Sequence, residues 1–184
     1  MIKIFFEAHS TTLDNEKHLS SGWNDVELSE LGIKQSQELG ERYKNIKLDA
    51  IFCSDLKRSY KTADIAFKSR DILIIQYQRL RECNYGDFTQ KSSDIVNNMK
   101  LNCINAPFPN GESYTETTNR MQLFLKELLQ NYDEKTIMII GHRATQYALE
   151  NLINNISLEK IISSPWKWQS GWIYNLKNNF KYEQ

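Results

Sequence analysis

Two histidines follow apolar segments that are typical of buried strands. His9 comes after Ile-Lys-Ile-Phe-Phe near the N-terminus, and His142 comes after Thr-Ile-Met-Ile-Ile-Gly. In an open parallel sheet, ligands bind beyond the carboxyl ends of the strands. If these two strands are neighbours, both imidazoles point into one crevice. For either histidine taken alone, the alternative is a satisfied polar residue at a strand end.

Arg58 occupies the first turn of a predicted helix, directly after another strand. The start of a helix attracts anions through its free backbone N–H groups and its dipole. A guanidinium at that place adds a planar, bidentate donor that suits phosphate. The residue pattern therefore favours a phosphate site, and the alternative is a surface arginine paired with Asp55 or Asp64.

Glu82 follows a third strand region and is a candidate proton donor. A carboxyl group near a phosphate can protonate a leaving alkoxide if burial or nearby anionic charge raises its pKa. A solvated loop glutamate is the alternative. A metal site is poorly supported, because two histidines without close acidic or thiolate residues form a weak ligand set.

Short apolar segments alternate with helix-like segments, and this order indicates the fold that positions these residues. Strands are expected at 2–6, 49–53, 72–75 and 136–140, and helices at 29–43, 55–67, 118–129 and 145–153, with Ser54 as the N-cap of the second helix. The apolar strands lack a clear alternation, as expected when both faces are covered. The prediction is an α/β fold with three layers, in which helices flank both faces of a mainly parallel sheet.

The remaining segments are less regular. Residues 83–115 hold prolines and weak strand patterns, so we interpret them as an excursion over the active-site end, partly helical at 92–99. The aromatic tail over 166–182 is expected to supply one or two edge strands. A length of 184 residues suits a single domain over 1–184.

The composition limits the binding partners and the cellular compartment that we expect for this protein. Lys and Arg number 23 and Asp and Glu number 23, so a broad electrostatic surface for nucleic acid or an anionic membrane is not expected. Cys53, Cys83 and Cys103 form no CxxC pair, and free thiols suit a reducing, cytoplasmic compartment. The N-terminal apolar segment is too short for a signal peptide or a membrane span. A homodimer is left open.

Six motifs occur in a fixed order over about four-fifths of the chain. They are Ala8-His9-Ser10-Thr11-Thr12-Leu13-Asp14-Asn15; Ser21-Gly22-Trp23-Asn24-Asp25 with Leu28-Ser29-x-x-Gly32-x-x-Gln35; Ser54-x-Leu56-x-Arg58-x-x-x-Thr62-Ala63; Leu80-x-Glu82-x-x-Tyr85-Gly86; Pro109-x-Gly111-Glu112-Ser113; and Gly141-His142. This set resembles the histidine phosphatases, the superfamily that includes cofactor-dependent phosphoglycerate mutase. The resemblance implies a phosphoglycerate mutase-like fold.

The resemblance also implies catalytic roles. His9 would attack phosphorus and become phosphohistidine, which divides one difficult displacement into two easier ones. Arg58 and His142 would hold the phosphoryl oxygens. Glu82 would donate a proton to the leaving group and later activate water. In such a mechanism no metal or organic cofactor is needed.

Substrate-binding roles are implied for a second set of positions, namely Asn15, Ser21, Gly22 and Tyr85. Aromatic residues near them, Phe88, Phe108 and Trp23, are candidates for an apolar wall of the pocket. We expect Trp166, Trp168 and Trp172 mainly to pack the C-terminal strand, with a role at the pocket rim as the alternative.

Three residues depart from the family pattern. Ala8 stands in place of an arginine, Ser10 in place of a glycine, and Arg143 in place of a glycine. Loss of one preorganised donor typically lowers the rate ~10²–10³-fold. Three explanations remain open: Arg143 or Arg81 restores the missing charge, the enzyme handles a different leaving group or acts slowly, or the site is a phosphate-binding relic.

The best-supported function is a metal-independent phosphatase, a phosphoric monoester hydrolase that acts on a small phosphorylated metabolite. Glu82 argues against the small phosphohistidine-phosphatase branch, which lacks that donor, and the short chain argues against the mutases. The alternatives are mutase-type phosphoryl transfer and a catalytically impaired pseudoenzyme that only binds a phosphate ligand. The residues that make up the proton donor and the anion clamp together favour the enzyme over the relic.

Overall fold

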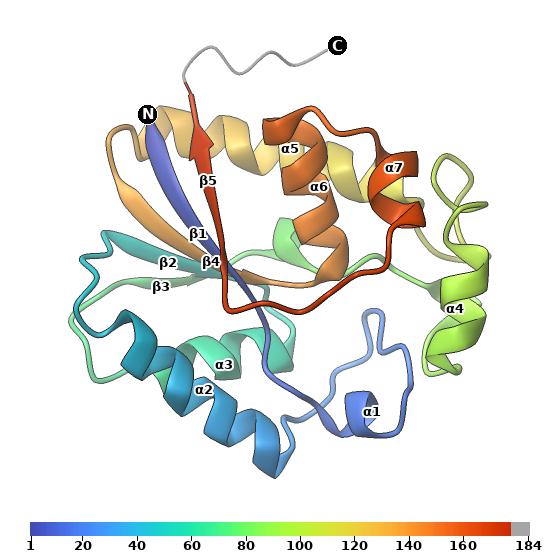
Figure 1. The fold of residues 1–184 in the computed structure, drawn as a ribbon, viewed down its shortest axis with the longest axis horizontal. Coiled ribbons are helices and arrows are strands. Elements are labelled where there is room, and N and C mark those ends of the chain that lie inside the picture. Colours follow the sequence, from blue (N-terminus) through green and yellow to red (C-terminus); the bar gives the residue numbers. More distant parts are fainter. Residues whose placement is uncertain (178–184) are drawn as a thin grey trace.

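The computed structural model describes residues 1–177, which contain one five-stranded sheet in the order β3-β2-β4-β1-β5 (Figure 1). The strands are β1 (Ile2–Ala8), β2 (Ala50–Cys53), β3 (Ile74–Gln76), β4 (Thr136–Gly141) and β5 (Trp172–Leu176). The pairs β2–β3, β2–β4 and β1–β4 are parallel, and only β5 pairs antiparallel, with β1. The predicted mainly parallel α/β sheet is confirmed.

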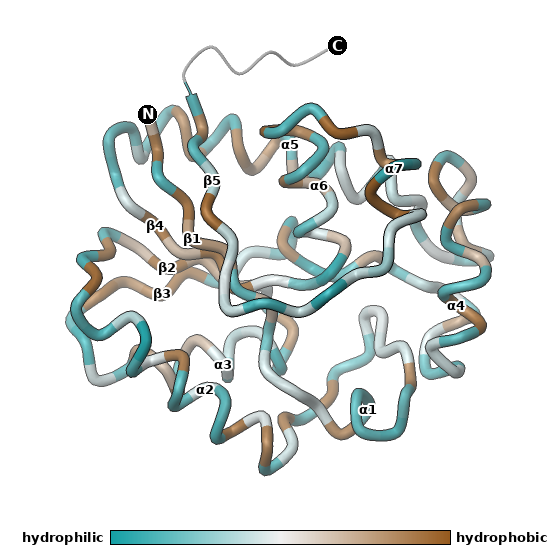
Figure 2. Tube along the Cα trace, in the orientation of Figure 1, coloured by the Kyte–Doolittle hydropathy of each residue, from teal (hydrophilic) through white to brown (hydrophobic). Residues whose placement is uncertain are grey.

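Helices cover both faces of this sheet (Figure 1). The helices α2 (Glu30–Tyr43) and α3 (Lys57–Phe67) lie on one face, and α5 (Tyr114–Asn131) and α6 (Arg143–Asn154) lie on the other. Figure 2 shows the central strands mostly in hydrophobic colours. Ile2, Ile4 and Phe6 of β1 contribute to the core under α5 and α6, whereas Phe5 contributes to the core under α2 and α3. Both faces of β1 are therefore buried, which explains why its sequence does not alternate.

Helix ends account for two differences from the prediction. The helix α5 begins at Tyr114, earlier than expected, because Ser113 caps it and forms a capping box with Glu116. The predicted N-cap at Ser54 is wrong. Leu56 occupies the N-cap of α3, and the Ser54 hydroxyl accepts a hydrogen bond from the Leu56 N–H at 3.1 Å. Ser54 thus shapes the turn before the helix, and the first helical N–H group, that of Lys57, donates instead to Asp25 Oδ1 at 2.8 Å.

The region after β3 is irregular, as expected. It holds the 3₁₀ helices η1 (Gln78–Leu80) and η2 (Gly86–Phe88) and the helix α4 (Ser93–Met99), which matches the predicted helix at 92–99. Two short helices were not predicted, α1 (Leu13–Glu16) and α7 (Leu158–Ser163). The tail supplies the edge strand β5, and the part of that prediction over 178–182 lies outside the described residues. None of the helices in the described part of the chain combines the length and apolar character that crossing a membrane requires.

Candidate active site

A cavity of about 370 Å³ opens beyond the carboxyl ends of β1 and β4. Ala8 pairs with Gly141 in the parallel register of these strands, so the next residue of each chain segment, His9 and His142, lies side by side. Nine sequence-predicted site residues all line this cavity: His9, Asn15, Ser21, Gly22, Arg58, Glu82, Tyr85, His142 and Arg143. The fold thus brings together residues from across the sequence.

One ring nitrogen of His9 is held by a hydrogen bond, and the other is left to react. Its Nδ1 is 2.8 Å from the Ser10 carbonyl oxygen, which can only accept, so Nδ1 carries a proton and Nε2 carries the lone pair. The backbone N–H of His9 donates to Gly141 O at 3.0 Å. Burial, together with the charge of Arg58, lowers the pKa of His9 from its ordinary value of 6.5 to about 3. The imidazole is therefore neutral near pH 7, as a nucleophile must be.

His142 lies at the N-cap of α6 and is fully buried. Its ring centroid is 5.0 Å from that of His9, and neither of its ring nitrogens has a hydrogen-bond partner among the described residues. Burial lowers the pKa of His142 well below its ordinary value. Unpaired buried polar atoms are costly, so this ring suits a polar group that enters the cavity.

Arg58 reaches the cavity from the first turn of α3 and is 2% exposed. Its guanidinium donates to Gly22 O at 2.7 Å and to Asn24 O at 3.0 Å. Within residues 1–177 it forms no ion pair, so neither Asp55 nor Asp64 neutralises it. A buried cation held by carbonyl oxygens keeps its charge available to an anion in the cavity.

Glu82 is buried and held by two backbone N–H groups. Its Oε1 accepts hydrogen bonds from Cys83 N at 2.8 Å and from Ala144 N, in the first turn of α6, at 3.1 Å. Because Oε1 is occupied, a protonated Glu82 would carry its proton on Oε2, which accepts no hydrogen bond from the described residues. The carboxyl group thus has a defined orientation for proton transfer.

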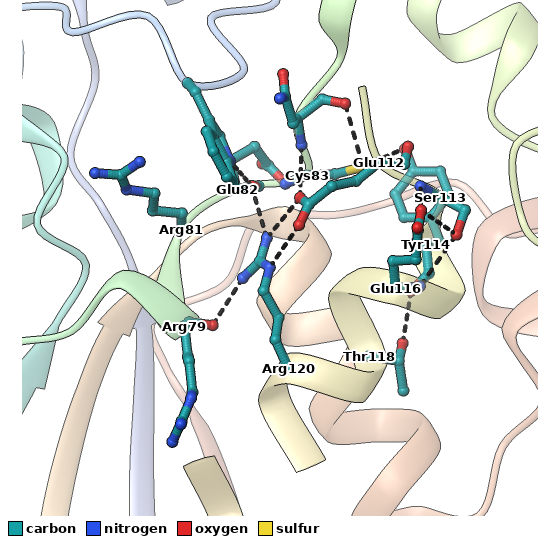
Figure 3. A network of polar contacts seen from close by, with 12 residues as sticks. Arg79, Arg81, Glu82, Cys83, Glu112, Ser113, Tyr114, Glu116, Thr118 and Arg120 are labelled. Atoms are coloured by element: carbon teal, nitrogen blue, oxygen red, sulfur yellow. Dashed lines mark hydrogen bonds and ion pairs between the residues drawn. The ribbon is translucent and has the colours of Figure 1, made fainter. Parts of the chain in front are cut away.

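A partly buried ion pair supports the backbone of Glu82 (Figure 3). Arg120 of α5 pairs with Glu112 at 3.0 Å, and its guanidinium also donates to Arg79 O at 2.7 Å and to Glu82 O at 2.8 Å. Trp23 Nε1 donates to the same Glu82 oxygen at 2.7 Å. Two donors therefore fix the peptide that carries the candidate acid.

The other predicted substrate-binding residues line the cavity with polar or small groups. Asn15 Oδ1 caps α1 by accepting from Thr12 N, so its amide nitrogen is left for a ligand. Ser21 donates to Asp14. Gly22 has φ +50°, a conformation that favours glycine, and its carbonyl holds Arg58. Tyr85 packs edge-on against Phe108 at 5.2 Å.

The two arginines considered as substitutes for the missing charge lie in different places. Arg81 forms a bidentate ion pair with Asp55 at 2.7 and 2.6 Å, stacks over Trp23, and does not line the cavity. Arg143 lines the cavity together with Ala8. The geometry therefore leaves Arg143 as the candidate and removes Arg81.

The set of aromatic residues that lines the cavity also differs from the prediction. Tyr85 lines the cavity, but Phe88, Phe108 and Trp23 do not, because Phe108 is fully buried beneath Tyr85 and Trp23 lies against Arg81. Trp166 and Trp168 line the cavity instead, in agreement with the alternative role at the pocket rim. Trp172 packs on Phe6, as predicted.

Residues that hold the His9 loop were not predicted as functional. Gln35 Oε1 accepts from Thr11 N at 2.9 Å and lines the cavity, Thr62 Oγ1 accepts from Ser10 N at 3.1 Å, and the Ser36 hydroxyl donates to Ser10 Oγ at 2.9 Å. Gln35 and Thr62 stood within the motifs, so their motif positions were the available signal. These contacts tie the loop to α2 and α3.

Comparison with known proteins decides the family. A sequence profile described as the histidine phosphatase superfamily (branch 1) matches residues 4–174. The chain belongs to this superfamily. Membership confirms the resemblance found in the sequence, and the structure supplies the phosphoglycerate mutase-like fold that it implied.

Named relatives within the superfamily include phosphatases. The chain is 30% identical over 149 residues to an uncharacterized phosphatase, PhoE, of Bacillus subtilis, covering 81% of this chain and 76% of that one. It is 25% identical over 171 residues to phosphoserine phosphatase 1 of Hydrogenobacter thermophilus, covering 89% and 81%. The solved structure of Bacillus stearothermophilus YhfR superposes with a TM-score of 0.85, at 24% identity, over 97% of this chain and 93% of that one. This last likeness bears on the fold.

The lowered pKa of His9 predicts a pH dependence of stability. A histidine that titrates near 3 in the native state and near 6.5 in the unfolded state binds fewer protons when folded between these values. The free energy of unfolding should therefore fall as the pH drops below 6.5. Replacing His9 with glutamine removes this contribution, which amounts to about 2 kcal/mol between about pH 7.5 and 5. Urea unfolding of both proteins at the two pH values measures it, and equal losses would contradict the shift.

Proposed function

We propose that the protein is a phosphatase that hydrolyses a small phosphomonoester through a phosphohistidine on His9. The observation that supports this most is the set of side chains that lines the cavity. A neutral imidazole with its Nδ1 fixed, a second imidazole, two arginines and an oriented carboxyl group all face the same space. Among residues 1–177, the second imidazole has no hydrogen-bond partner and the two arginines form no ion pairs. This set corresponds to nucleophile, anion clamp and proton donor.

The first step follows from this arrangement. His9 Nε2 attacks phosphorus while the bond from phosphorus to the ester oxygen breaks. Glu82 Oε2 gives its proton to the departing oxygen, so the alcohol leaves neutral. The phosphorylated ring holds a positive charge, which the Ser10 carbonyl stabilises through Nδ1–H. Arg58, His142 and Arg143 donate to the phosphoryl oxygens as they pass through the transition state, with help from the Asn15 amide.

The second step returns the enzyme to its starting form. Glu82, now a carboxylate, accepts a proton from water as that water attacks phosphorus. The bond from Nε2 to phosphorus breaks, and inorganic phosphate leaves. Ser21, Gly22 and Tyr85 contact the rest of the substrate. A mutase would pass the phosphoryl group to a second hydroxyl in place of water, and a pseudoenzyme would stop at binding.

A hydrolysis panel tests this function. The purified protein is incubated with p-nitrophenyl phosphate and with phosphorylated metabolites, in the presence of EDTA, and free phosphate and isomerised esters are both quantified. We expect free phosphate from at least one ester, undiminished by EDTA, without isomerised product. Isomerised ester as the main product would support the mutase, and tight phosphate binding without any turnover would support the pseudoenzyme.

A further inference from the structure

Arg143 is a cavity cation that no carboxylate holds. Its NH1 is 3.3 Å from Asn97 Oδ1 in α4, which is a long and uncharged contact. Among residues 1–177 it forms no ion pair, whereas Arg81 and Arg120 each pair with a carboxylate. Burial disfavours its charge, but the surrounding Tyr85, Tyr147, Glu82 and Tyr114 together raise the pKa of Arg143 above its ordinary value. Its guanidinium is therefore charged and available to a ligand.

A tryptophan from the C-terminal segment lies against this guanidinium. The Arg143 guanidinium carbon lies 5.0 Å from the centroid of the Trp166 ring, within the range of a cation–π contact. Trp166 stacks on Trp172 at 6.0 Å with an interplanar angle of 29°, and Trp172 meets Phe6 edge-on at 5.8 Å. A row of aromatic rings thus connects the guanidinium to the core strand β1, which leads to His9.

The type of support has a chemical consequence. A carboxylate could fix Arg143 equally well, but it would neutralise the charge and compete with phosphate for the same N–H groups. An aromatic face attracts the flat side of a guanidinium and leaves its N–H edge free to donate. The arrangement therefore orients a cation for an incoming anion without neutralising it.

Ala8 affects how much positive charge the cavity holds. Its side chain ends at Cβ and lines the same cavity as Arg143, so the β1 side of the site contributes no charged group from this position. We infer that Trp166 is a positioning residue that holds the Arg143 guanidinium at the phosphate end of the cavity, and that this pair supplies the charge that Ala8 lacks. This inference rests on the proposed function and adds to it a dependence on the C-terminal segment.

A double-mutant cycle tests the pair. Four proteins are compared: wild type, Arg143→Ala, Trp166→Leu and the double variant. The measured quantities are kcat/KM for p-nitrophenyl phosphate and the Kd of inorganic phosphate from calorimetry. We expect Arg143→Ala to lower kcat/KM about 100-fold and Trp166→Leu about 10-fold. The double variant should be no worse than Arg143→Ala alone, because Trp166 acts only through Arg143.

Further variants separate positioning from a general loss of structure. Trp166→Phe keeps an aromatic face and should recover most of the loss caused by leucine. Ile173→Ala removes apolar surface from β5, where the side chain is 59% exposed and outside the cavity, and should leave kcat/KM unchanged. An equal loss from Trp166→Leu with and without Arg143 would overturn the inference, as would an unchanged Trp166→Leu protein.

The phosphate Kd distinguishes failure of this inference from failure of the proposed function. Phosphate binding requires no turnover, so the coupling between Trp166 and Arg143 can be measured in a protein that hydrolyses nothing. Coupled losses of phosphate affinity without hydrolysis would support the role of Trp166 and contradict the proposed phosphatase activity. Hydrolysis that depends on His9, without coupling between Trp166 and Arg143, would support the proposed phosphatase activity and overturn the inference.

Discussion

The variant His9→Ala is expected to lower kcat for p-nitrophenyl phosphate by at least ~10⁴-fold, because it removes the only group placed to form the covalent intermediate in our scheme. Binding should survive, since Arg58 is held by Gly22 O and Asn24 O independently of His9. We therefore expect kcat to fall while the Kd of inorganic phosphate changes little by comparison.

A histidine outside the candidate site, His18, offers a matched control. His18 is exposed, lies outside the cavity and has φ +54°, a conformation that asparagine tolerates. His18→Asn should keep the wild-type rate. Wild-type turnover in His9→Ala would exclude the covalent route, whatever else the cavity binds.

The variant Glu82→Gln is expected to separate substrates by their leaving groups. Glutamine keeps an oxygen that can accept from Cys83 N and Ala144 N, so the backbone contacts survive while the proton is lost. Esters of alkyl alcohols, which need protonation, should lose ~10²–10⁴ in kcat/KM. The first step with p-nitrophenyl phosphate, whose leaving group is stable as an anion, should lose much less.

Pre-steady-state kinetics makes this prediction sharper. Because Glu82 also activates water, p-nitrophenyl phosphate should give Glu82→Gln a rapid burst of p-nitrophenol followed by slow turnover. The control is Glu27→Gln, which replaces a carboxylate that pairs with Lys57 and Lys61 at the surface and should leave both phases unchanged. Equal losses for alkyl and aryl esters in kcat/KM, without a burst, would contradict the role assigned to Glu82.

The fold was largely predictable from the sequence because its strands are buried on both faces. Continuous apolar segments such as those ending before His9 and His142 have few alternatives to a parallel sheet covered by helices. The short helices α1 and α7 escaped prediction, since each is stabilised by local capping and tertiary contacts and has too few residues for a periodic pattern. The N-cap prediction at Ser54 was wrong because a serine hydroxyl before a helix can accept a hydrogen bond within a turn as well as cap the helix.

The site was predictable where chemistry is tied to strand ends and motifs. His9, Arg58, Glu82 and His142 each follow a strand region, so the parallel topology gathers them at one edge. The support of Arg143 was not predictable, because Trp166 lies 23 positions later and reaches it only through the path of the chain after α7. Likewise, nothing in the sequence distinguished Arg81, bound by Asp55, from an arginine that faces the cavity.

Trapping of the phosphorylated protein tests the central claim most directly. The protein is mixed with a ³²P-labelled phosphomonoester, quenched in base, digested, and the labelled peptide is identified by mass spectrometry. We predict one phosphoryl group on His9, stable in base, labile in acid and absent from His9→Ala. The account would be contradicted if the wild type and Glu82→Gln both release phosphate steadily while neither protein carries a label on His9.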